Sequence, residues 1–222
     1  RCLTALSNEE AEGEEVEGRL YHLRYPFTST EGDKAAQAAA VAQAAAPESG
    51  VEAIGRLPDG TWYLTVSTTR PETMLGDTGV AVNPKDERYT GLVGAKIELP
   101  LTGRTIPIIA DELVDPAFGT GLVKVTPAHD PNDFEMAQRS DLPILDVMTD
   151  EATMGENAPE SFRGLDRIEA RKKVIAEFEA LGLYGGEEIY VRSVPHCYRC
   201  HTLVEPRLSL QWFVRMKPLA EP

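Results

Sequence analysis

Short stretches in which apolar and polar residues alternate fill the chain from residue 61 to residue 126. They are TWYLTVSTT, TGVAVN, AKIELP, RTIPIIA and TGLVKVT, all rich in β-forming residues and separated by Gly, Pro or Asp. Most of the gaps between them leave no room for a crossover helix. The pattern predicts an α+β protein that is mostly β, with a closed or nearly closed β-barrel or folded-sheet core and a few peripheral helices.

Two further strands are predicted outside this region. RLYHLRY at 19–25 alternates in the manner of a half-buried strand and follows the acidic stretch EEAEGEEVE. EEIYVRS at 187–193 has the composition of a final strand. Both predicted strands lie near the ends of the chain.

Residues 166–182 have the periodicity of an amphipathic helix packed on the outside of the core. Asp166 is the expected N-cap and Gly182 the expected stop. The predicted buried side holds Ile168, Ile175, Phe178 and Leu181.

An alanine-rich segment at 34–46 has nine alanines in thirteen positions and can form a helix by propensity. It offers almost no apolar face beyond Val41. We therefore expect a surface insertion over 31–58, with Pro47 closing the alanine run, and no direct role in function.

Composition narrows the class of protein. The 222 residues are 42% hydrophobic and 26% charged, as in an ordinary globular protein, and no apolar run is long enough for a membrane role. The net charge of −14 argues against long, sequence-blind contact with nucleic acid, although contact with a strand end stays open. Three cysteines fit a reducing, cytoplasmic setting, and the opening RCLTALSNEE, without Met or leader, suggests a piece of a longer protein.

The segment KVTPAHDPNDFE at 124–135 places polar groups at the end of a strand and the start of a helix. Strand alternation puts Lys124 and Thr126 on one face, which is a candidate pocket wall. Asp130, Pro131 and Asp133 match the N-cap, N1 and N3 positions of a short helix, so capping alone could explain Asp130.

A second polar strand end lies in STTRPETMLGDTG at 67–79. Thr68 and Thr69 end the strand, and Arg70 and Thr73 follow in the turn. An exposed turn is the simple interpretation of this stretch by itself. Two such ends in one β core could instead converge on a single cleft that contains donors and carboxylates.

Four segments carry a resemblance to a known family. They are TTRPETMLGDTGVAVNPKDERY, LPLTGRTIPIIADELVD, FGTGLVKVTPAHDPNDFEMAQR and RGLDRIEARKKV. In order and nearly letter for letter they resemble the connective-peptide editing domain of the valyl-tRNA synthetases, a branch of the class I aminoacyl-tRNA synthetases. The resemblance covers essentially the whole chain except the alanine-rich segment. It implies one editing domain over 1–222, with 1–18 and 194–222 as connections to the synthetic body.

The resemblance implies hydrolysis of threonine wrongly esterified to valine tRNA. Its partners would be the 3'-terminal adenosine of that tRNA, threonine and its esters, and the catalytic domain of the parent synthetase in cis, with no cofactor for the hydrolysis itself. Asp133 would hold the ammonium group of the amino acid, while Lys124, Thr126 and Asp130 would surround its hydroxyl.

The same resemblance places Arg70 and Thr73 nearer the adenosine or the ester, at the end of the strand that carries Thr68 and Thr69. No serine or cysteine nucleophile with a histidine partner is evident, so attack by a positioned water is the economical mechanism. His129 as general base is the alternative to a structural histidine.

Two other functions remain open from the sequence. The domain could be a binding module that holds the tRNA end and leaves hydrolysis to the full enzyme. It could also be a free-standing zinc-dependent hydrolase, although the cysteines lie far in sequence from both polar strand ends.

The segment HCYRCHTLVEP contains the remaining motif, a C-x-x-C pair of Cys197 and Cys200. Two thiolates at this spacing make half of a tetrahedral zinc site. Cys2 is the third candidate ligand, and the resemblance suggests that a fourth lies before Arg1. A structural zinc, incomplete in this chain, and free thiols are therefore both possible.

Overall fold

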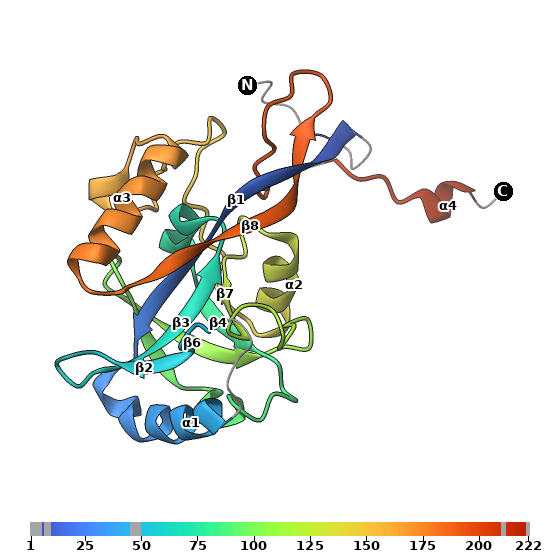
Figure 1. Ribbon diagram of the computed structural model, residues 1–222. Coiled ribbons are helices and arrows are strands. Elements are labelled where there is room, and N and C mark those ends of the chain that lie inside the picture. Colours follow the sequence, from blue (N-terminus) through green and yellow to red (C-terminus); the bar gives the residue numbers. More distant parts are fainter. Residues whose placement is uncertain (1–5, 7–9, 45–49, 210–211, 221–222) are drawn as a thin grey trace.

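The β structure consists of two four-stranded sheets (Figure 1). The computed structural model describes residues 6, 10–44, 50–209 and 212–220. The first sheet has the order β2 (Ile54–Arg56), β3 (Trp62–Thr68), β1 (Ala11–Pro26) and β8 (Tyr184–Cys197). The second has the order β5 (Lys96–Leu99), β6 (Arg104–Ala110), β4 (Gly79–Val82) and β7 (Leu122–Val125). All ladders are antiparallel except the parallel pair of β4 and β6.

The predicted closed or nearly closed barrel is wrong, because neither sheet curls round to pair its outer strands. β2 and β8 are the edges of the first sheet, and β5 and β7 are the edges of the second. The sheets meet at an isolated bridge between Phe27 and Ile97. β1 and β8 instead run on together as a two-stranded ribbon away from the body (Figure 1). Mixed α/β structure with two sheets is therefore the observed class.

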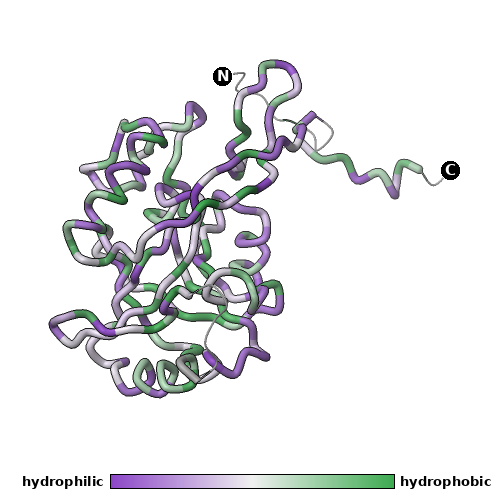
Figure 2. The backbone as a smooth tube through the Cα atoms, in the orientation of Figure 1, coloured by the Kyte–Doolittle hydropathy of each residue, from purple (hydrophilic) through white to green (hydrophobic). Residues whose placement is uncertain are grey.

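The individual strands predicted between residues 61 and 126 are confirmed as β3, β4, β5, β6 and β7. Their buried side chains join β1 in one large apolar core, and the green stretches of Figure 2 follow the central strands. The strand predicted at 19–25 is the inner part of β1, which is much longer, and the acidic residues before it form its exposed outer end. Alternation thus located these strands, whereas β1 and β8 extend beyond the predicted 19–25 and 187–193.

Helix α1 (Gly32–Ala44) corrects the expectation for the alanine-rich segment. Ala35, Ala38 and Ala39 are at most 5% exposed and belong to the main core, whereas Val41 is 45% exposed. Small side chains let this helix approach the sheet closely, so the apolar face consists of alanines. Whether 31–58 is an insertion stays a prediction.

Helix α3 (Arg167–Ala180) begins and ends as predicted. The Asp166 side chain accepts a hydrogen bond from the N–H of Ile168, and Gly182 has a φ of 70° just past the end. The buried side differs from the predicted one. Ala170, Val174 and Phe178 face the core, whereas Ile168 is 40% exposed.

The remaining helices are shorter. α2 (Pro131–Arg139) follows β7, and α4 (Met216–Ala220) lies near the C-terminal end. Single 3-10 turns occupy Ser29–Glu31, Pro71–Gly76, Thr90–Leu92 and Glu160–Phe162. In the part of the chain that the structure describes, no helix has the length and apolar character needed to cross a bilayer.

Candidate functional site

The two polar strand ends meet in the interior of the molecule. β3 leads into the 3-10 turn Pro71–Gly76, and β7 leads into α2. The side chains of Thr73 and Lys124 touch, with 2.9 Å from Lys124 Nζ to Thr73 Oγ1. The predicted convergence of segments some fifty residues apart is thus present in the structure.

A buried polar cluster forms at this meeting point; it consists of Tyr25, Thr73, Asp77, Lys124 and Thr126. Lys124 Nζ donates to the hydroxyls of Thr73 and Thr126 and lies 3.4 Å from Asp77 Oδ1. Thr126 in turn donates to Asp77 Oδ1 at 2.6 Å, and the Tyr25 hydroxyl donates to Asp77 Oδ2 at 2.8 Å. Every polar side-chain group of the cluster has a partner.

Local sequence explains how these groups come together. Alternation along β7 puts Lys124 and Thr126 on one side. Pro71 opens the 3-10 turn, and Asp77 ends it with its N–H bonded to the Met74 carbonyl. The turn therefore delivers both Thr73 and Asp77 to Lys124.

Burial dominates the electrostatics of the cluster. Asp77 is fully buried, which raises the pKa of its carboxyl, while Lys124 acts in the opposite direction. The Arg104 guanidinium adds support by donating to the backbone carbonyls of Asp77 and Leu75, at 2.8 and 2.6 Å. The side chain of Lys124 is 10% exposed and that of Asp77 is not exposed at all.

Asp133 lies next to this cluster through the backbone of Thr126. Its Oδ2 accepts from the Thr126 N–H at 2.8 Å, and the residue is 7% exposed. Burial raises the pKa of Asp133 to about 7, with Lys124 opposing the shift. A carboxyl with that pKa gains its charge near neutral pH and can hold a cation.

Arg70 lies at the edge of the site, between the two strand ends and the C-terminal segment. Its N–H is bonded to Thr68 Oγ1 at 3.0 Å, and its guanidinium donates to the His129 carbonyl at 2.9 Å and pairs with Glu205. The Thr73 hydroxyl donates to the Arg70 carbonyl at 3.0 Å, which joins Arg70 to the polar cluster.

His129 is almost completely buried, and its ring has a structural contact. Nε2 accepts a hydrogen bond from the Val147 N–H at 3.2 Å, so this nitrogen is not free to take a proton from water. Burial lowers the pKa of His129 to about 4. This geometry favours a neutral, positioning histidine over a general base.

Two other predicted residues lie outside the cluster. Asp130 is exposed and caps α2, accepting from the N–H groups of Asn132 and Asp133 at 2.8 and 3.3 Å. Helix capping, which the sequence offered as an alternative to a role in the site, therefore accounts for the position of Asp130. Thr69 is partly exposed, and among the described residues no hydrogen bond engages its side chain.

The cysteine knuckle lies far along the chain, at the end of β8. Cys197 is buried and Cys200 is partly buried, while Cys2 falls outside the described residues. Within the described ranges no group of three or more His, Cys, Asp or Glu side chains is placed to hold a metal. A tetrahedral zinc site would need two further ligands besides Cys197 and Cys200.

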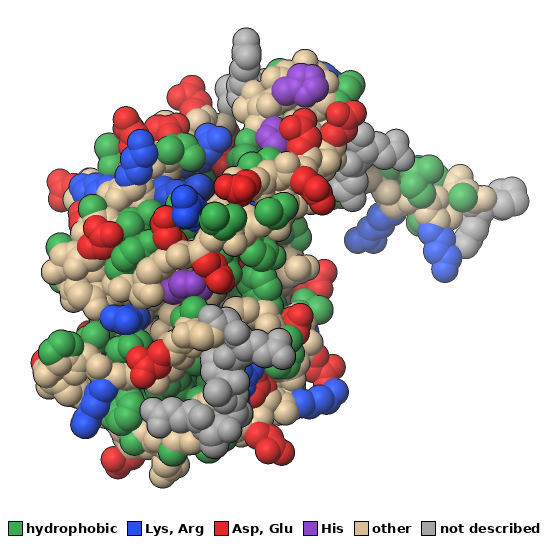
Figure 3. All heavy atoms as spheres, in the orientation of Figure 1, with side chains coloured by type: hydrophobic (Ala, Val, Ile, Leu, Met, Phe, Trp, Pro, Cys, Tyr) green, Lys and Arg blue, Asp and Glu red, His purple; other side chains and the backbone are tan. Residues whose placement is uncertain are grey.

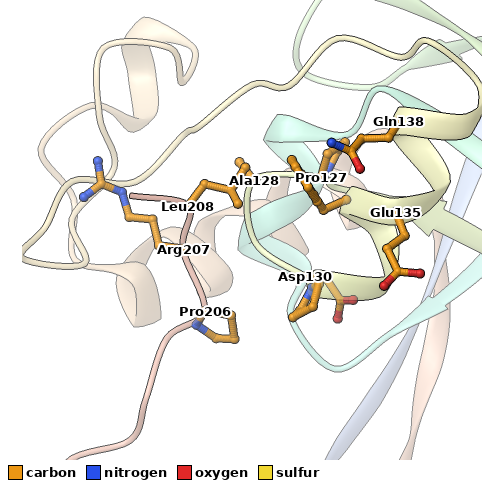
Figure 4. Close-up of a pocket in the computed structure, with 10 residues that line it drawn as sticks. Pro127, Ala128, Asp130, Glu135, Gln138, Pro206, Arg207 and Leu208 are labelled. Carbon is orange, nitrogen blue, oxygen red and sulfur yellow. The ribbon is translucent and has the colours of Figure 1, made fainter. Parts of the chain in front are cut away.

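A pocket of about 470 Å³ separates α2 from the segment that follows the knuckle (Figure 4). Pro127, Ala128 and α2 form one wall, and residues 206–208 form the other. Figure 4 shows Arg207 pointing away from α2. The pocket therefore lies directly beside the segment that carries His129.

Sequence reasoning missed Asp77 and Tyr25 as members of the site. Asp77 was visible in the second polar segment, four residues after Thr73, but its place opposite Lys124 depends on the turn. Tyr25 belongs to β1, and only the tertiary fold brings it to Asp77.

Comparisons with known proteins agree on the kind of domain. A family model described as "Leucyl-tRNA synthetase, editing domain" matches residues 85–165. Valine-tRNA ligases from Carboxydothermus hydrogenoformans and Thermotoga maritima are 53% and 48% identical, each over 221 residues that cover 100% of this chain and 22% of the relative. The ligase of Geobacillus stearothermophilus is 48% identical over 98% of this chain and 21% of its own length. The chain thus spans about a fifth of these relatives.

One solved structure supports the fold alone. It is described as "The crystal structure of GlLeuRS-CP1", with a TM-score of 0.53 and 13% identity, covering 74% of this chain and 96% of that one. Its likeness agrees with a connective-peptide architecture in place of the barrel that the sequence predicted.

Proposed function

This chain belongs to the aminoacyl-tRNA synthetase editing-domain family, with valine-tRNA ligases as relatives, and from that premise we propose that it proofreads mischarged tRNA by hydrolysis. The specific substrate is threonine esterified to valine tRNA. The partners are the 3'-terminal adenosine of that tRNA and the catalytic domain of the parent synthetase in cis.

The long contact between Lys124 and Asp77 carries this proposal. An ammonium group has three N–H donors, and Lys124 directs them at Thr73, Thr126 and Asp77. The contact with Asp77 is the longest, at 3.4 Å. A substrate hydroxyl can accept from Lys124 in place of that long contact, whereas a methyl group that blocks the contact leaves a buried donor unpaired.

This arrangement reverses the selectivity of a valine-shaped pocket. An apolar pocket rejects threonine only weakly, and the synthetic site of valyl-tRNA synthetases is itself the standard example, at about a hundredfold. A second site built from buried polar groups favours threonine, because each unmade hydrogen bond costs about 1–3 kcal/mol. The buried polar cluster supplies such groups.

Asp133 supplies the second point of recognition. Its charged form attracts the ammonium group of the amino acid, and a bound cation lowers the pKa from about 7. Ester orientation is then fixed at both ends, by Asp133 and by the polar cluster. Fixed orientation is the main catalytic contribution that an activated ester needs.

The chemical step is attack by water on the ester carbonyl. The new bond joins the water oxygen to the carbonyl carbon, the bond to the ribose oxygen breaks, and the proton lost by water ends on that oxygen. The products are free threonine and intact tRNA. Lys124 and Arg70 are cations of the site that oppose the negative charge that develops on the carbonyl oxygen.

Purified protein incubated with threonyl and valyl esters of valine tRNA tests this function. We expect faster release of threonine than of valine, and a loss of that activity in Asp133→Ala. Equal rates for the two esters, or no rate above blank with folded protein, would refute the proposal.

A non-catalytic tRNA-end binding module is the second candidate, favoured by a site whose polar groups are already paired. It predicts tRNA-end binding that is unchanged in Asp133→Ala, with no hydrolysis in either protein.

A structural zinc at the knuckle is a separate proposal, since the described cysteines do not complete the site. Metal analysis of the purified protein tests it, and neither candidate function depends on it.

A further inference from the structure

A group of arginines surrounds the outer side of Arg70. This arginine cluster consists of Arg70, Arg167, Arg171 and Arg192, with Glu72 and Glu205 among them. The whole protein carries a net charge of −14, so four guanidinium groups against two carboxylates make a local exception. Figure 3 shows basic side chains gathered between α3 and the β1–β8 ribbon, with acidic ones spread over the rest of this face.

The two carboxylates have different environments. Glu72 is completely buried and is held by both nitrogens of the Arg171 fork, at 2.7 and 2.8 Å. Glu72 is therefore a fixed part of the fold. Glu205 is partly exposed and bridges Arg70 to Arg167, with 2.6 Å from its Oε1 to Arg167 Nε.

Arg192 is the member of the cluster without a direct anionic partner. It lies half-buried on β8, and within the part of the chain that the structure describes no hydrogen bond or ion pair engages its guanidinium. Burial and the nearby charges of Arg171 and Arg70 lower the pKa of Arg192. A cation held among cations is stabilised by any anion that binds there.

Glu205 belongs to a segment that lies at the surface. This strap, residues 205–208, has no fully buried residue. The Leu208 N–H is bonded to the Ala128 carbonyl at 3.1 Å, and the Arg207 side chain pairs with Asp146 and Asp150. The pocket of Figure 4 lies beneath the strap, between it and α2. Moving the strap therefore breaks polar contacts that water can replace.

We propose that the arginine cluster binds backbone phosphates of the RNA strand that delivers the ester, and that the Glu205 carboxylate occupies part of this site until RNA displaces it. Guanidinium forks match phosphate and carboxylate alike, so Glu205 sits where a phosphate oxygen pair fits. Arg70 belongs to the cluster and also contacts Thr73, which places the phosphates next to the polar cluster. The inference rests on the proposed function, because the RNA-linked ester brings phosphate to this place.

Binding of a short single-stranded RNA ending in adenosine tests the site, with inorganic phosphate and adenosine alone as separate probes. We expect Glu205→Gln to tighten RNA binding several-fold, since the internal competitor loses its charge. Arg192→Gln should weaken RNA binding several-fold and reduce the slope of log affinity against log salt by about 0.7. Neither inorganic phosphate nor adenosine should bind in the concentration range of the RNA.

Matched substitutions control for net charge and folding. Arg139→Gln removes a cation of α2 that pairs with Asp111, and Glu98→Gln removes an exposed carboxylate on β5. Neither should change RNA binding beyond the small effect of one distant charge. Arg167→Gln provides a second test within the cluster, and denaturant midpoints establish that each variant is folded.

Unchanged RNA binding in folded Arg192→Gln and Arg167→Gln would overturn the proposal, as would unchanged or weaker binding in Glu205→Gln. Inorganic phosphate that binds as tightly as RNA would also overturn it, in favour of a simple anion site. The RNA probe carries no ester, so its binding is independent of whether the protein hydrolyses mischarged tRNA. A failure of the proposed hydrolysis can therefore be distinguished from a failure of the proposed RNA site.

Discussion

The polar cluster and the arginine cluster adjoin each other, yet they hold charge in opposite ways. In the polar cluster the charge of Lys124 faces the buried carboxyl of Asp77, and two threonine hydroxyls complete the hydrogen bonds. In the arginine cluster cations outnumber carboxylates, and Arg70 and Arg167 remain 17% and 19% exposed. Arg70 joins the two through its carbonyl and its guanidinium.

One edge of the fold can therefore contribute to recognition in two ways, by discrimination and by attraction. Buried, fully paired groups discriminate, because any mismatch leaves a donor or acceptor without water or partner. Partly exposed, unbalanced charge attracts but does not discriminate, and salt screens it. The polar cluster is suited to recognising a hydroxyl group, and the arginine cluster is suited to attracting a charged strand.

Removing the carboxyl of Asp77 should have the largest effect on the fold. Asp77→Ala leaves Lys124 and the Tyr25 hydroxyl buried without their shared partner, which we expect to lower the free energy of unfolding by about 3–5 kcal/mol. Urea denaturation measures the loss, and hydrolysis of the threonyl ester should fall with it.

A surface-facing ion pair provides the matched control for that substitution. Glu112 pairs with Lys85, and both side chains are mostly exposed, so Glu112→Ala should leave the free energy of unfolding almost unchanged. Similar losses in the two variants would contradict the contrast between inner and outer charge.

Asp133→Asn should slow hydrolysis and stabilise the fold. A carboxyl whose pKa is raised to about 7 favours the protonated form in the folded state, so the native protein loses stability as pH rises from about 4 to about 7. The asparagine variant lacks this loss and should be more stable at pH 8, on the order of 2–4 kcal/mol. Hydrolysis by the native protein should rise through pH 7, and the variant should be about a hundredfold slower.

Asp130→Asn is the control for that prediction. Asparagine caps a helix as well as aspartate does, and Asp130 is exposed, so stability should change by less than about 1 kcal/mol. A large pH-dependent gain in this control, or none in Asp133→Asn, would show that burial of Asp133 is not the cause.

Thr126→Val should alter selectivity more than stability. Valine keeps the shape and removes the hydroxyl that joins Lys124 to Asp77. We expect the preference for threonyl over valyl ester to fall about tenfold, because one unmade hydrogen bond is worth about 1–2 kcal/mol. Thr105→Val, on the exposed side of β6, should leave the preference unchanged.

Local sequence signals were sufficient for the elements and for half of the site. β-branched alternation predicted β3 through β7, and capping residues predicted the starts of α2 and α3. Strand alternation and turn chemistry also brought Lys124 and Thr126 into one candidate site with Thr73.

What the sequence could not predict depends on long-range packing. Sheet order, and with it the absence of a barrel, follows from which strands pair across the chain, as β4 does with β6 in parallel. The alanine face of α1 is buried only because the core accepts small side chains there. Tyr25 and Glu205 reach the site from elements far away in sequence, so no local pattern marks them.

Salt provides the smallest and most selective test of the comparison. Raising the salt concentration from about 50 to about 200 mM should weaken RNA binding about tenfold or more if three phosphates are neutralised by the arginine cluster. The same change should alter hydrolysis of a threonyl ester of adenosine, which has no phosphate, by less than about twofold, because buried pairs are poorly screened. The affinity for RNA and the rate of ester hydrolysis, measured across one salt series, give the two sensitivities together. Equal sensitivity to salt would mean that the polar cluster is as open to ions as the arginine cluster. The two clusters would then not differ in the way proposed.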